Sequence, residues 1–392
     1  MAYPQVVVEP SAAKRLRHFD CLVFRDELHE PSASLANGEI DELTDRDGAF
    51  MAYAFYSPTS HIAARAVSLT REQPIDRALL AQRLQSALRR RADITGTNAK
   101  RLVFSEADGL PGLIVDQYGD HLVLQTRIAG MERVKSTIVD LLRHSLHPKG
   151  ILERSDKEFR EQEGLPPVTQ VLTGSVPDRL LIEEDGLQFL VDPYHGQKTG
   201  FYLDQRQTRH RTRELIRAGE RVLDVCTYTG AFGIGAASRG AQVVCLEQQE
   251  SLVALAKENA KLNGVEARIE FVVGDAFYWL EAKANARERV DWVLLDPPSL
   301  AKSKADMLKG RQALHRLLVH SLGLLKAAGI LVVSVCTYHL LGVAEEMLRI
   351  AAEEQALRLR IRGLSLQAED HPWVLQMPMT RYLMSWIAQR DE

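Results

Sequence analysis

Three carboxylates and one thiol follow short apolar runs in the second half of the chain, and each run has the composition of a buried strand. The carboxylates are those of Glu247, Asp275 and Asp296, and the thiol belongs to Cys336, which follows Ile330–Val335. The carboxyl ends of parallel strands meet at one edge of a sheet, where α/β proteins bind their ligands. Carboxylates at that edge can accept hydrogen bonds from hydroxyl and amino groups, and a thiol can act as a nucleophile.

The stretch 219–247 predicts the unit around which these residues are arranged. Of the usual glycine-rich nucleotide turn only Gly230 is present, with Cys226 and Tyr228 where glycines are expected. Glu247 follows the turn by about twenty residues, a spacing that suits a pair of ribose hydroxyls. By itself this stretch leaves two interpretations open, a nucleotide-like ligand and a plain α/β core. The predicted strand, turn, helix and second strand are 221–225, 227–230, 231–238 and 241–246.

Length and composition limit the class of protein. The 392 residues suggest two or three domains, and the 45% hydrophobic and 26% charged content is ordinary for a globular chain. A formal net charge of −3 excludes a protein that is basic overall, although a local basic face would suffice for nucleic acid. The four scattered cysteines have no metal-ligand spacing, so we expect neither a metal site nor a disulfide framework. With no secretory or membrane-spanning run apparent, we expect a cytoplasmic protein.

The chain predicts an α/β fold in three successive parts. Residues 1–70 alternate turn signals with β-like runs and predict a small β-barrel module. Residues 71–185 predict a linker helix and a mixed α+β domain, in which the polar segment 156–179 is expected to form a loop or a peripheral hairpin. Residues 186–392 alternate strands with helices, which predicts a parallel sheet with ligands at its C-terminal edge.

Two polar segments allow both a structural and a functional interpretation. Arg89, Arg90 and Arg91 end a predicted helix, where arginines usually complement the helix dipole, and an RNA-facing role is the alternative. The segment "HGQKTGFYLDQR" contains Lys198 and Asp204 before another helix. Its composition favours a ligand-facing loop over a solvated helix start.

The order of the strand-end residues is that of a class I methyltransferase. The turn at Tyr228 to Gly230 is followed by an acid for a ribose, an acid for an adenine amino group, and an acidic Pro-Pro motif. Taken singly, Asp275 also suits a helix cap, and Asp296-Pro297-Pro298 an ordinary turn. Together they make the chain resemble the RlmI family of S-adenosylmethionine-dependent 23S ribosomal RNA cytosine-C5 methyltransferases. The resemblance covers nearly the whole chain and includes "SEADGLPGLIVDQYG", "VDPYHGQKTGFYLDQR", "CTYTGAF", "LDPPSLAKSK", "SVCT" and "AEDHPWVLQMPMTRYL".

This resemblance implies a Rossmann-like methyltransferase domain at 186–392 and an RNA-binding, PUA-like module at 1–70. The implied cofactor is S-adenosylmethionine, and the implied partner is 23S ribosomal RNA or a large-subunit precursor, with no membrane partner. A homodimer stays open. Asp296 would face both the cofactor and the base. The residues implied to line the cofactor site are Lys198, Asp204, Tyr228, Gly230, Glu247, Asp275 and Asp296.

The chemistry of cytosine methylation fits Cys336 and Asp296. Cytosine C5 is a poor nucleophile, and a thiolate that adds at C6 would give an enamine-like intermediate able to attack a sulfonium methyl group. A carboxyl near N3 and N4 would stabilise the changing charge of the ring. Cys336 is placed for the first role and Asp296 for the second, so we predict both to be catalytic. The alternative for Cys336 is a buried core cysteine.

The chain departs from the family at two places. Many RNA cytosine-C5 methyltransferases carry a further cysteine after the motif proline, where this chain has Pro298-Ser299, so the base that removes the C5 proton is unassigned. The front module has His18 to Phe24, "HFDCLVF", in place of the usual His-Pro-Trp-Val-Phe. Lys302 and Lys304 are candidates, by charge alone, for favouring the thiolate of Cys336.

Two other functions stay open at this point. An acidic Pro-Pro motif also suits methylation of the exocyclic amino group of a purine in ribosomal RNA, and Cys336 discriminates because that reaction needs no thiol. The other alternative is a non-catalytic RNA-binding or ribosome-assembly protein. The complete set of strand-end acids argues against it.

Overall fold

The computed structural model describes residues 3–29, 34–301 and 303–392, so the candidate Lys302 lies outside the described residues. The chain divides into two compact units. The first unit consists of Met1–Ile182, Val191–Leu203 and Glu369–Thr380. The second unit consists of Glu183–Leu190, Asp204–Ala368 and Arg381–Glu392.

The front of the first unit is a five-stranded sheet in the order β1-β3-β4-β5-β2, which confirms the predicted β-rich module. Strand residues alternate between its two faces, and Leu43 and Ala54 pack inward with Leu16 of the helix. The outward residues Tyr53 and Phe55 join the core of the following domain. The elements are β1 (Gln5–Val7), α1 (Pro10–Arg17), β2 (Leu22–Phe24), β3 (Ile40–Thr44), β4 (Phe50–Tyr56) and β5 (Ile62–Ser68).

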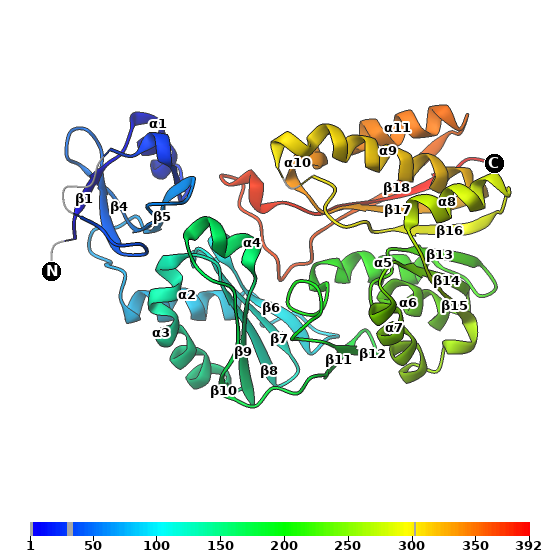
Figure 1. The fold of residues 1–392 in the computed structure, drawn as a ribbon, viewed down its shortest axis with the longest axis horizontal. Coiled ribbons are helices and arrows are strands. Elements are labelled where there is room, and N and C mark those ends of the chain that lie inside the picture. The colour runs from blue at the N-terminus through cyan, green and yellow to red at the C-terminus, as the bar shows by residue number, and fades with distance from the viewer. Residues whose placement is uncertain (1–2, 30–33, 302) are drawn as a thin grey trace. The chain divides into compact units, whose positions relative to one another are not determined.

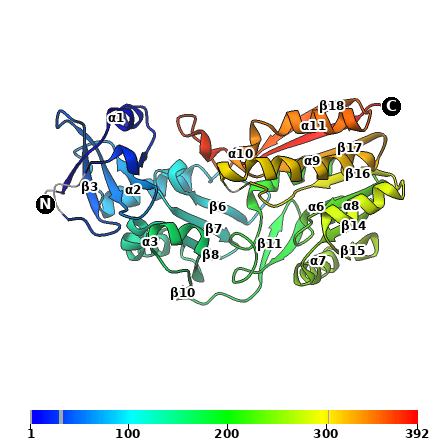
Figure 2. The same ribbon diagram turned by 45° about the horizontal axis from the view of Figure 1, so that its top comes forward.

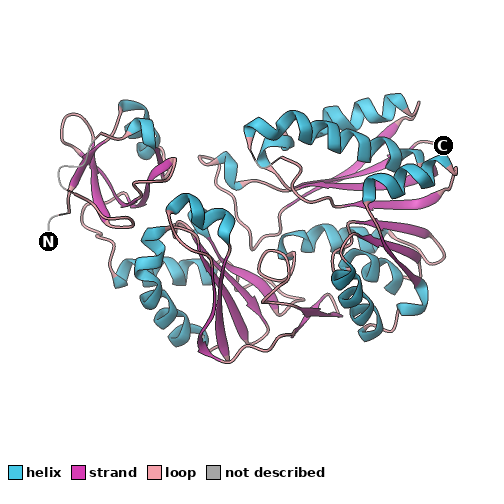
Figure 3. Ribbon diagram, viewed as in Figure 1, coloured by secondary structure: helices cyan, strands magenta, loops and turns pink. Residues whose placement is uncertain are grey.

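The rest of the first unit contains a second five-stranded sheet, in the order β10-β9-β8-β7-β6. Helices α2 and α3 lie beside it (Figure 3), and their apolar residues pack with those of the strands. The main elements are α2 (Arg77–Arg89), β6 (Ala99–Phe104), β7 (Leu113–Tyr118), β8 (His121–Thr126), α3 (Ala129–Leu146), β9 (Gly150–Ser155), α4 (Lys157–Arg160) and β10 (Val168–Gly174).

The polar segment 156–179, expected to form a loop or a peripheral hairpin, contains an edge strand of this sheet. Val168–Gly174 pairs antiparallel with β9, the strand before it in the chain, as the hairpin alternative predicts. Its residues are mostly solvated, so no apolar alternation marked it. Two of the three arginines at the end of the predicted helix have structural contacts: Arg90 and Arg91 both bind Asp108 at 2.7 Å, and Arg91 is only 1% exposed, whereas Arg89 is exposed. These contacts favour the helix-end interpretation over an RNA-facing role.

The second unit is built on a seven-stranded sheet in the order β15-β14-β13-β16-β17-β19-β18. Strands β15 to β17 run parallel, as predicted, and β19 and β18 add an antiparallel edge. The strands are β13 (Arg221–Val225), β14 (Gln242–Glu247), β15 (Ile269–Val273), β16 (Val290–Leu295), β17 (Leu325–Val335), β18 (Leu359–Leu366) and β19 (Met384–Arg390).

Helices cover both faces of this sheet. Helices α6 and α7 lie on one face, and α9 and α11 lie on the other (Figures 1 and 2). In the described part of the chain, no helix is long and apolar enough to cross a membrane. The helices are α5 (Arg206–Leu215), α6 (Ala231–Ser238), α7 (Glu250–Leu262), α8 (Ala276–Asn285), α9 (Met307–Gly323), α10 (Tyr338–Leu341) and α11 (Ala344–Glu354).

Two segments of the expected C-terminal domain belong to the first unit. In residues 191–203, the Thr199 hydroxyl lies 2.8 Å from the Tyr118 hydroxyl. In residues 369–380, a carboxylate oxygen of Asp370 accepts from the backbone amide of Arg101 at 2.9 Å. The domain boundaries 1–70, 71–185 and 186–392 therefore stay a prediction. The two compact units of the structure divide the chain at other residues.

Candidate functional site

The C-terminal edge of the parallel sheet brings the predicted strand-end residues of the second unit together. Val225 of β13 pairs with Leu246 of β14 on one side and with Leu295 of β16 on the other. Leu295 in turn pairs with Val333 of β17. The loops that follow these strands are therefore neighbours. They carry Tyr228, Gly230, Asp296 and Cys336, with Glu247 at the end of β14 and Asp275 following the adjacent β15.

Two residues other than glycine adopt left-handed backbone angles in the turn between β13 and α6. Cys226 and Tyr228 have φ angles of 61° and 54°, in the left-handed region that favours glycine, and Gly230 has φ 87°. Cys226 and Tyr228 thus adopt the conformation that glycines would adopt more easily. The turn is held by backbone hydrogen bonds, from Thr227 to Leu246 at 3.0 Å and from Gly230 to Thr227 at 2.9 Å.

Glu247 ends β14 and accepts three backbone hydrogen bonds. Its Oε2 accepts from Tyr228 at 3.0 Å, and its Oε1 accepts from Gln248 at 2.9 Å and from Gln249 at 3.2 Å. The carboxylate therefore links the turn to the start of α7. An ionised carboxylate has about four acceptor positions, so capacity remains for a hydroxyl of a ligand.

Asp275 is the N-cap of α8, so the capping interpretation of this residue is right. Its Oδ1 accepts from the backbone amides of Phe277 at 2.9 Å and Tyr278 at 3.3 Å. The Oδ2 atom makes no hydrogen bond to the described residues, so it can accept one from the amino group of a ligand. Capping and ligand binding are therefore compatible, and Glu247 and Asp275 together fit the ribose and the base of an adenosyl group.

A pair of polar contacts connects the start of α5 to the site. The Tyr382 hydroxyl donates to Oδ2 of Asp204 at 2.6 Å. Nε2 of Gln205 donates to Oδ1 of Asp296 at 2.8 Å. Sequence reasoning named both acids and assigned no role to Gln205 or Tyr382. The available signals were that Gln205 adjoins Asp204 in the polar loop and that Tyr382 lies in the family-like segment "AEDHPWVLQMPMTRYL".

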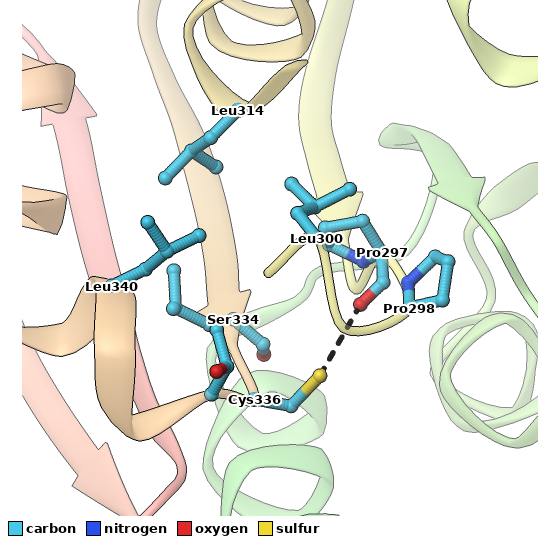
Figure 4. Close-up of a pocket in the computed structure, with 9 residues that line it drawn as sticks. Pro297, Pro298, Leu300, Leu314, Ser334, Cys336 and Leu340 are labelled. Carbon is cyan, nitrogen blue, oxygen red and sulfur yellow. Dashed lines mark hydrogen bonds between the residues drawn. The ribbon is translucent and has the colours of Figure 1, made fainter. Parts of the chain in front are cut away.

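Cys336 and the Pro-Pro motif line one pocket of the second unit (Figure 4). The Sγ atom of Cys336 lies 3.6 Å from the carbonyl oxygen of Pro297. The pocket lies between these groups and residues of α9 and α10. Its lining residues are Pro297, Pro298, Leu300, Leu314, Ser334, Val335, Cys336, Thr337 and Leu340. The thiol of Cys336 therefore lies beside the Pro-Pro motif, in largely apolar surroundings.

The surroundings of the other three cysteines raise the pKa of their thiols. Burial raises the pKa of Cys21 and Cys245 well above the usual value of a thiol. Burial also raises the pKa of Cys226, with a further contribution from the charge of Glu247. Thiols with raised pKa values form little thiolate and are poor nucleophiles. Cys336 follows β17 and is half-buried, as Cys21 and Cys226 are, so its nucleophilic role stays a prediction.

Lys198 is the one predicted cofactor residue that lies in the first unit. Its backbone has φ 54°, and its Nζ lies 4.8 Å from the ring centroid of Tyr202. Its predicted role toward the cofactor stays a prediction.

Comparison with known proteins agrees with this architecture. Residues 6–69 match a PUA-like domain, and residues 166–359 match an S-adenosylmethionine-dependent methyltransferase domain. The ribosomal RNA large subunit methyltransferase I proteins of Yersinia pseudotuberculosis (serotype O:1b, strain IP 31758) and Yersinia pestis are each 33% identical over 374 residues. That alignment covers 94% of this chain and 94% of each relative. The chain belongs to this methyltransferase family.

Solved structures share the fold. The protein SMU.776, crystallised with SAH, has a TM-score of 0.86 at 22% identity, covering 99% of this chain and 100% of that one. The tRNA m1G37 methyltransferase of M. jannaschii has a TM-score of 0.52 at 16% identity, covering 72% and 76%. The predicted fold class is thus confirmed, and the methyl donor of this family is S-adenosylmethionine.

Proposed function

We propose that the protein methylates C5 of a cytosine in large-subunit ribosomal RNA, through a covalent bond between Cys336 and C6 of the base. The Yersinia relatives are ribosomal RNA large subunit methyltransferases, which supports the RNA substrate. The observation that carries the choice of C5 is the position of the Cys336 thiol, which lines the same pocket as Pro297 and Pro298.

The residues of the second unit have separate roles in cofactor binding and in catalysis. Glu247 and Asp275 hold the adenosyl half of S-adenosylmethionine, and Tyr228 and Gly230 form the turn beside it. Asp204 is proposed to complete the cofactor site. The cofactor supplies an electrophilic methyl group. Cys336 adds to C6 and makes C5 nucleophilic, while the Asp296 carboxyl interacts with N3 and N4 of the ring.

Methylation of a purine amino group is the competing reaction, because an acidic Pro-Pro motif suits it. That reaction needs no thiol in the pocket. The proximity of the Cys336 Sγ to the Pro297 carbonyl therefore favours the cytosine reaction.

The test is the identity of the product and of the trapped cysteine. Wild-type protein should convert cytidine in large-subunit RNA to 5-methylcytidine, measured by mass spectrometry of nucleosides. RNA that contains 5-fluorocytosine should become covalently attached at Cys336, because fluorine cannot leave as a proton does. Cys336→Ala should bind S-adenosylmethionine normally and make no 5-methylcytidine, and Cys245→Ala is the matched control. Product from Cys336→Ala, or a trapped peptide with another cysteine, would refute the mechanism.

A further inference from the structure

Gln205 contacts the proposed catalytic acid directly. It immediately precedes α5, and its side chain is 2% exposed. Its Nε2 donates a hydrogen bond of 2.8 Å to Oδ1 of Asp296, a residue 91 positions further along the chain. Because a hydrogen bond to a charged group is directional and strong, this contact fixes the orientation of the Asp296 carboxylate.

The same contact fixes the orientation of the Gln205 amide. An ionised carboxylate can only accept hydrogen bonds, so the amide nitrogen and not the oxygen must face Asp296. The amide oxygen Oε1 is buried and has no hydrogen-bond partner among the residues that the structure describes. Buried acceptors without a partner are rare in native proteins, and one beside a reaction centre calls for a donor from outside the chain.

The two acceptors that would face this donor indicate its chemical type. Oε1 and Nε2 are bonded to the same carbon, so Oε1 and the Asp296 carboxylate are two acceptors close to one another. Two adjacent acceptors suit a nitrogen that carries two hydrogens. Cytosine has such an exocyclic amino group at C4, whereas uracil has a carbonyl oxygen there, which two acceptors would repel.

We propose that Gln205 orients Asp296 and that the two side chains together accept the amino hydrogens of the target cytosine. This proposal rests on the proposed function, because it places the base beside Asp296 and Cys336. It makes Gln205 a residue that selects cytosine over uracil. Asp296 by itself would accept one hydrogen, without a fixed orientation.

The experiment uses full-length protein and two transcripts of large-subunit RNA, one with the mapped target cytidine and one with uridine in its place. Gln205→Met keeps the length of the side chain and removes the donor and the acceptor. We expect its kcat on the cytidine transcript to fall at least tenfold, and its preference for cytidine over uridine to fall at least tenfold. The Kd for S-adenosylmethionine, measured by calorimetry without RNA, should stay within twofold of the wild-type value. Gln389→Met, which loses only the bond of Nε2 to the Ala328 carbonyl, is the matched control.

Gln205→Glu supplies a readout that a purely structural role would not change. A protonated carboxyl can donate to Asp296 and accept from the base, as the amide does, whereas an ionised carboxyl repels Asp296. Activity of this variant should therefore be partly restored at low pH and lost as the pH rises, relative to wild type.

Three results would overturn the proposal: an unchanged cytidine preference in Gln205→Met, a pH profile of Gln205→Glu parallel to that of wild type, or a loss of cofactor affinity that accounts for the loss of activity. The last result would assign Oε1 to the cofactor. The product of wild-type protein tests the proposed function separately. If the methyl group is found on an adenine amino group, the cytosine reaction falls. The Kd values of the same variants for RNA with adenosine and for RNA with inosine at the target position are then compared, because inosine lacks that amino group, and an unchanged ratio overturns the role of Gln205.

Discussion

The backbone amide of Tyr228 donates to Oε2 of Glu247 at 3.0 Å, so the predicted ribose acid also holds the turn before α6. Glu247→Ala removes the acceptor for this amide and for a ribose hydroxyl at once. Losing a charge-assisted hydrogen bond to the cofactor costs roughly 1.5–3 kcal/mol. We therefore expect S-adenosylmethionine to bind at least about tenfold more weakly, measured by calorimetry.

A control separates the cofactor contact from general destabilisation. Glu258 is exposed on α7, and Glu258→Ala should leave cofactor affinity unchanged. Glu247→Ala should retain its circular dichroism spectrum, because the sheet does not depend on this side chain. Wild-type affinity in the folded variant would remove Glu247 from the cofactor site.

Two glycines of α6 should respond to alanine in opposite directions. A Cβ at Gly233 would lie 2.4 Å from Sγ of Cys245 and 3.0 Å from a carboxylate oxygen of Asp224, whereas at Gly235 the nearest atom would be 3.8 Å away. Gly233→Ala should destabilise the fold by about 1–3 kcal/mol through overpacking. Gly235→Ala should be neutral or stabilise it by up to about 1 kcal/mol through helix propensity. Denaturant unfolding measures both, and equal effects would contradict the close packing of α6 on the sheet.

The sequence predicted most accurately the helices and strands whose bounds depend on a local pattern of residues. Arg221–Val225, Ala231–Ser238 and Val290–Leu295 have the expected bounds, because buried parallel strands are continuous apolar runs and because glycine marks the end of a helix. The strand-end acids could be named for the same reason, since the edge of a parallel sheet follows from the order of its strands. The family resemblance added the cofactor, which the turn by itself left open.

Contacts between residues far apart in the chain could not be predicted from the sequence pattern. Nothing in the composition of Val168–Gly174 indicated an edge strand, because its partner β9 supplies the pairing. The antiparallel strands β18 and β19 were likewise missed, since β19 depends on its pairing with β17. The contact of Gln205 with Asp296 joins residues far apart in the chain, and no local spacing reports it.

The end of α1 offers a test of the RNA-binding role that the family resemblance implies for the front module. Lys14 and Phe19 are both exposed, Phe19 by 65%, and Phe19 adopts a left-handed φ of 67°. A cation and an exposed ring can contact phosphate and stack on a base. Lys14→Ala combined with Phe19→Ala should raise KM for RNA several-fold and leave kcat and cofactor affinity unchanged, because these residues would only position the substrate.

The matched control for this variant replaces an exposed lysine and an exposed apolar side chain elsewhere. Lys309→Ala combined with Leu308→Ala, on α9, meets this requirement. Steady-state kinetics at fixed salt compares the two double variants, since phosphate contacts depend on salt. Identical KM values would exclude the end of α1 from the RNA-binding surface.

The carboxyl of Asp224 should make stability depend on pH. It is fully buried beneath the turn, where Gly233 donates a backbone hydrogen bond to it at 2.8 Å. Burial raises its pKa from 3.8 to about 6. The folded state therefore binds more protons than the unfolded state between about pH 4 and pH 6, and the stability that this group contributes is fully present below pH 4 and lost as the pH rises through 6.

Asp224→Asn keeps an acceptor for Gly233 and removes the titration. Relative to wild type, the variant should gain stability as the pH rises from about 4 to about 7, by about 3 kcal/mol for the stated rise in pKa. Thermal unfolding of both proteins across this range measures the difference. Asp93→Asn, at an exposed carboxyl, is the control and should parallel wild type at every pH. A constant difference between Asp224→Asn and wild type would show that Asp224 is ionised in the folded protein with an ordinary pKa, and that the turn tolerates a buried charge.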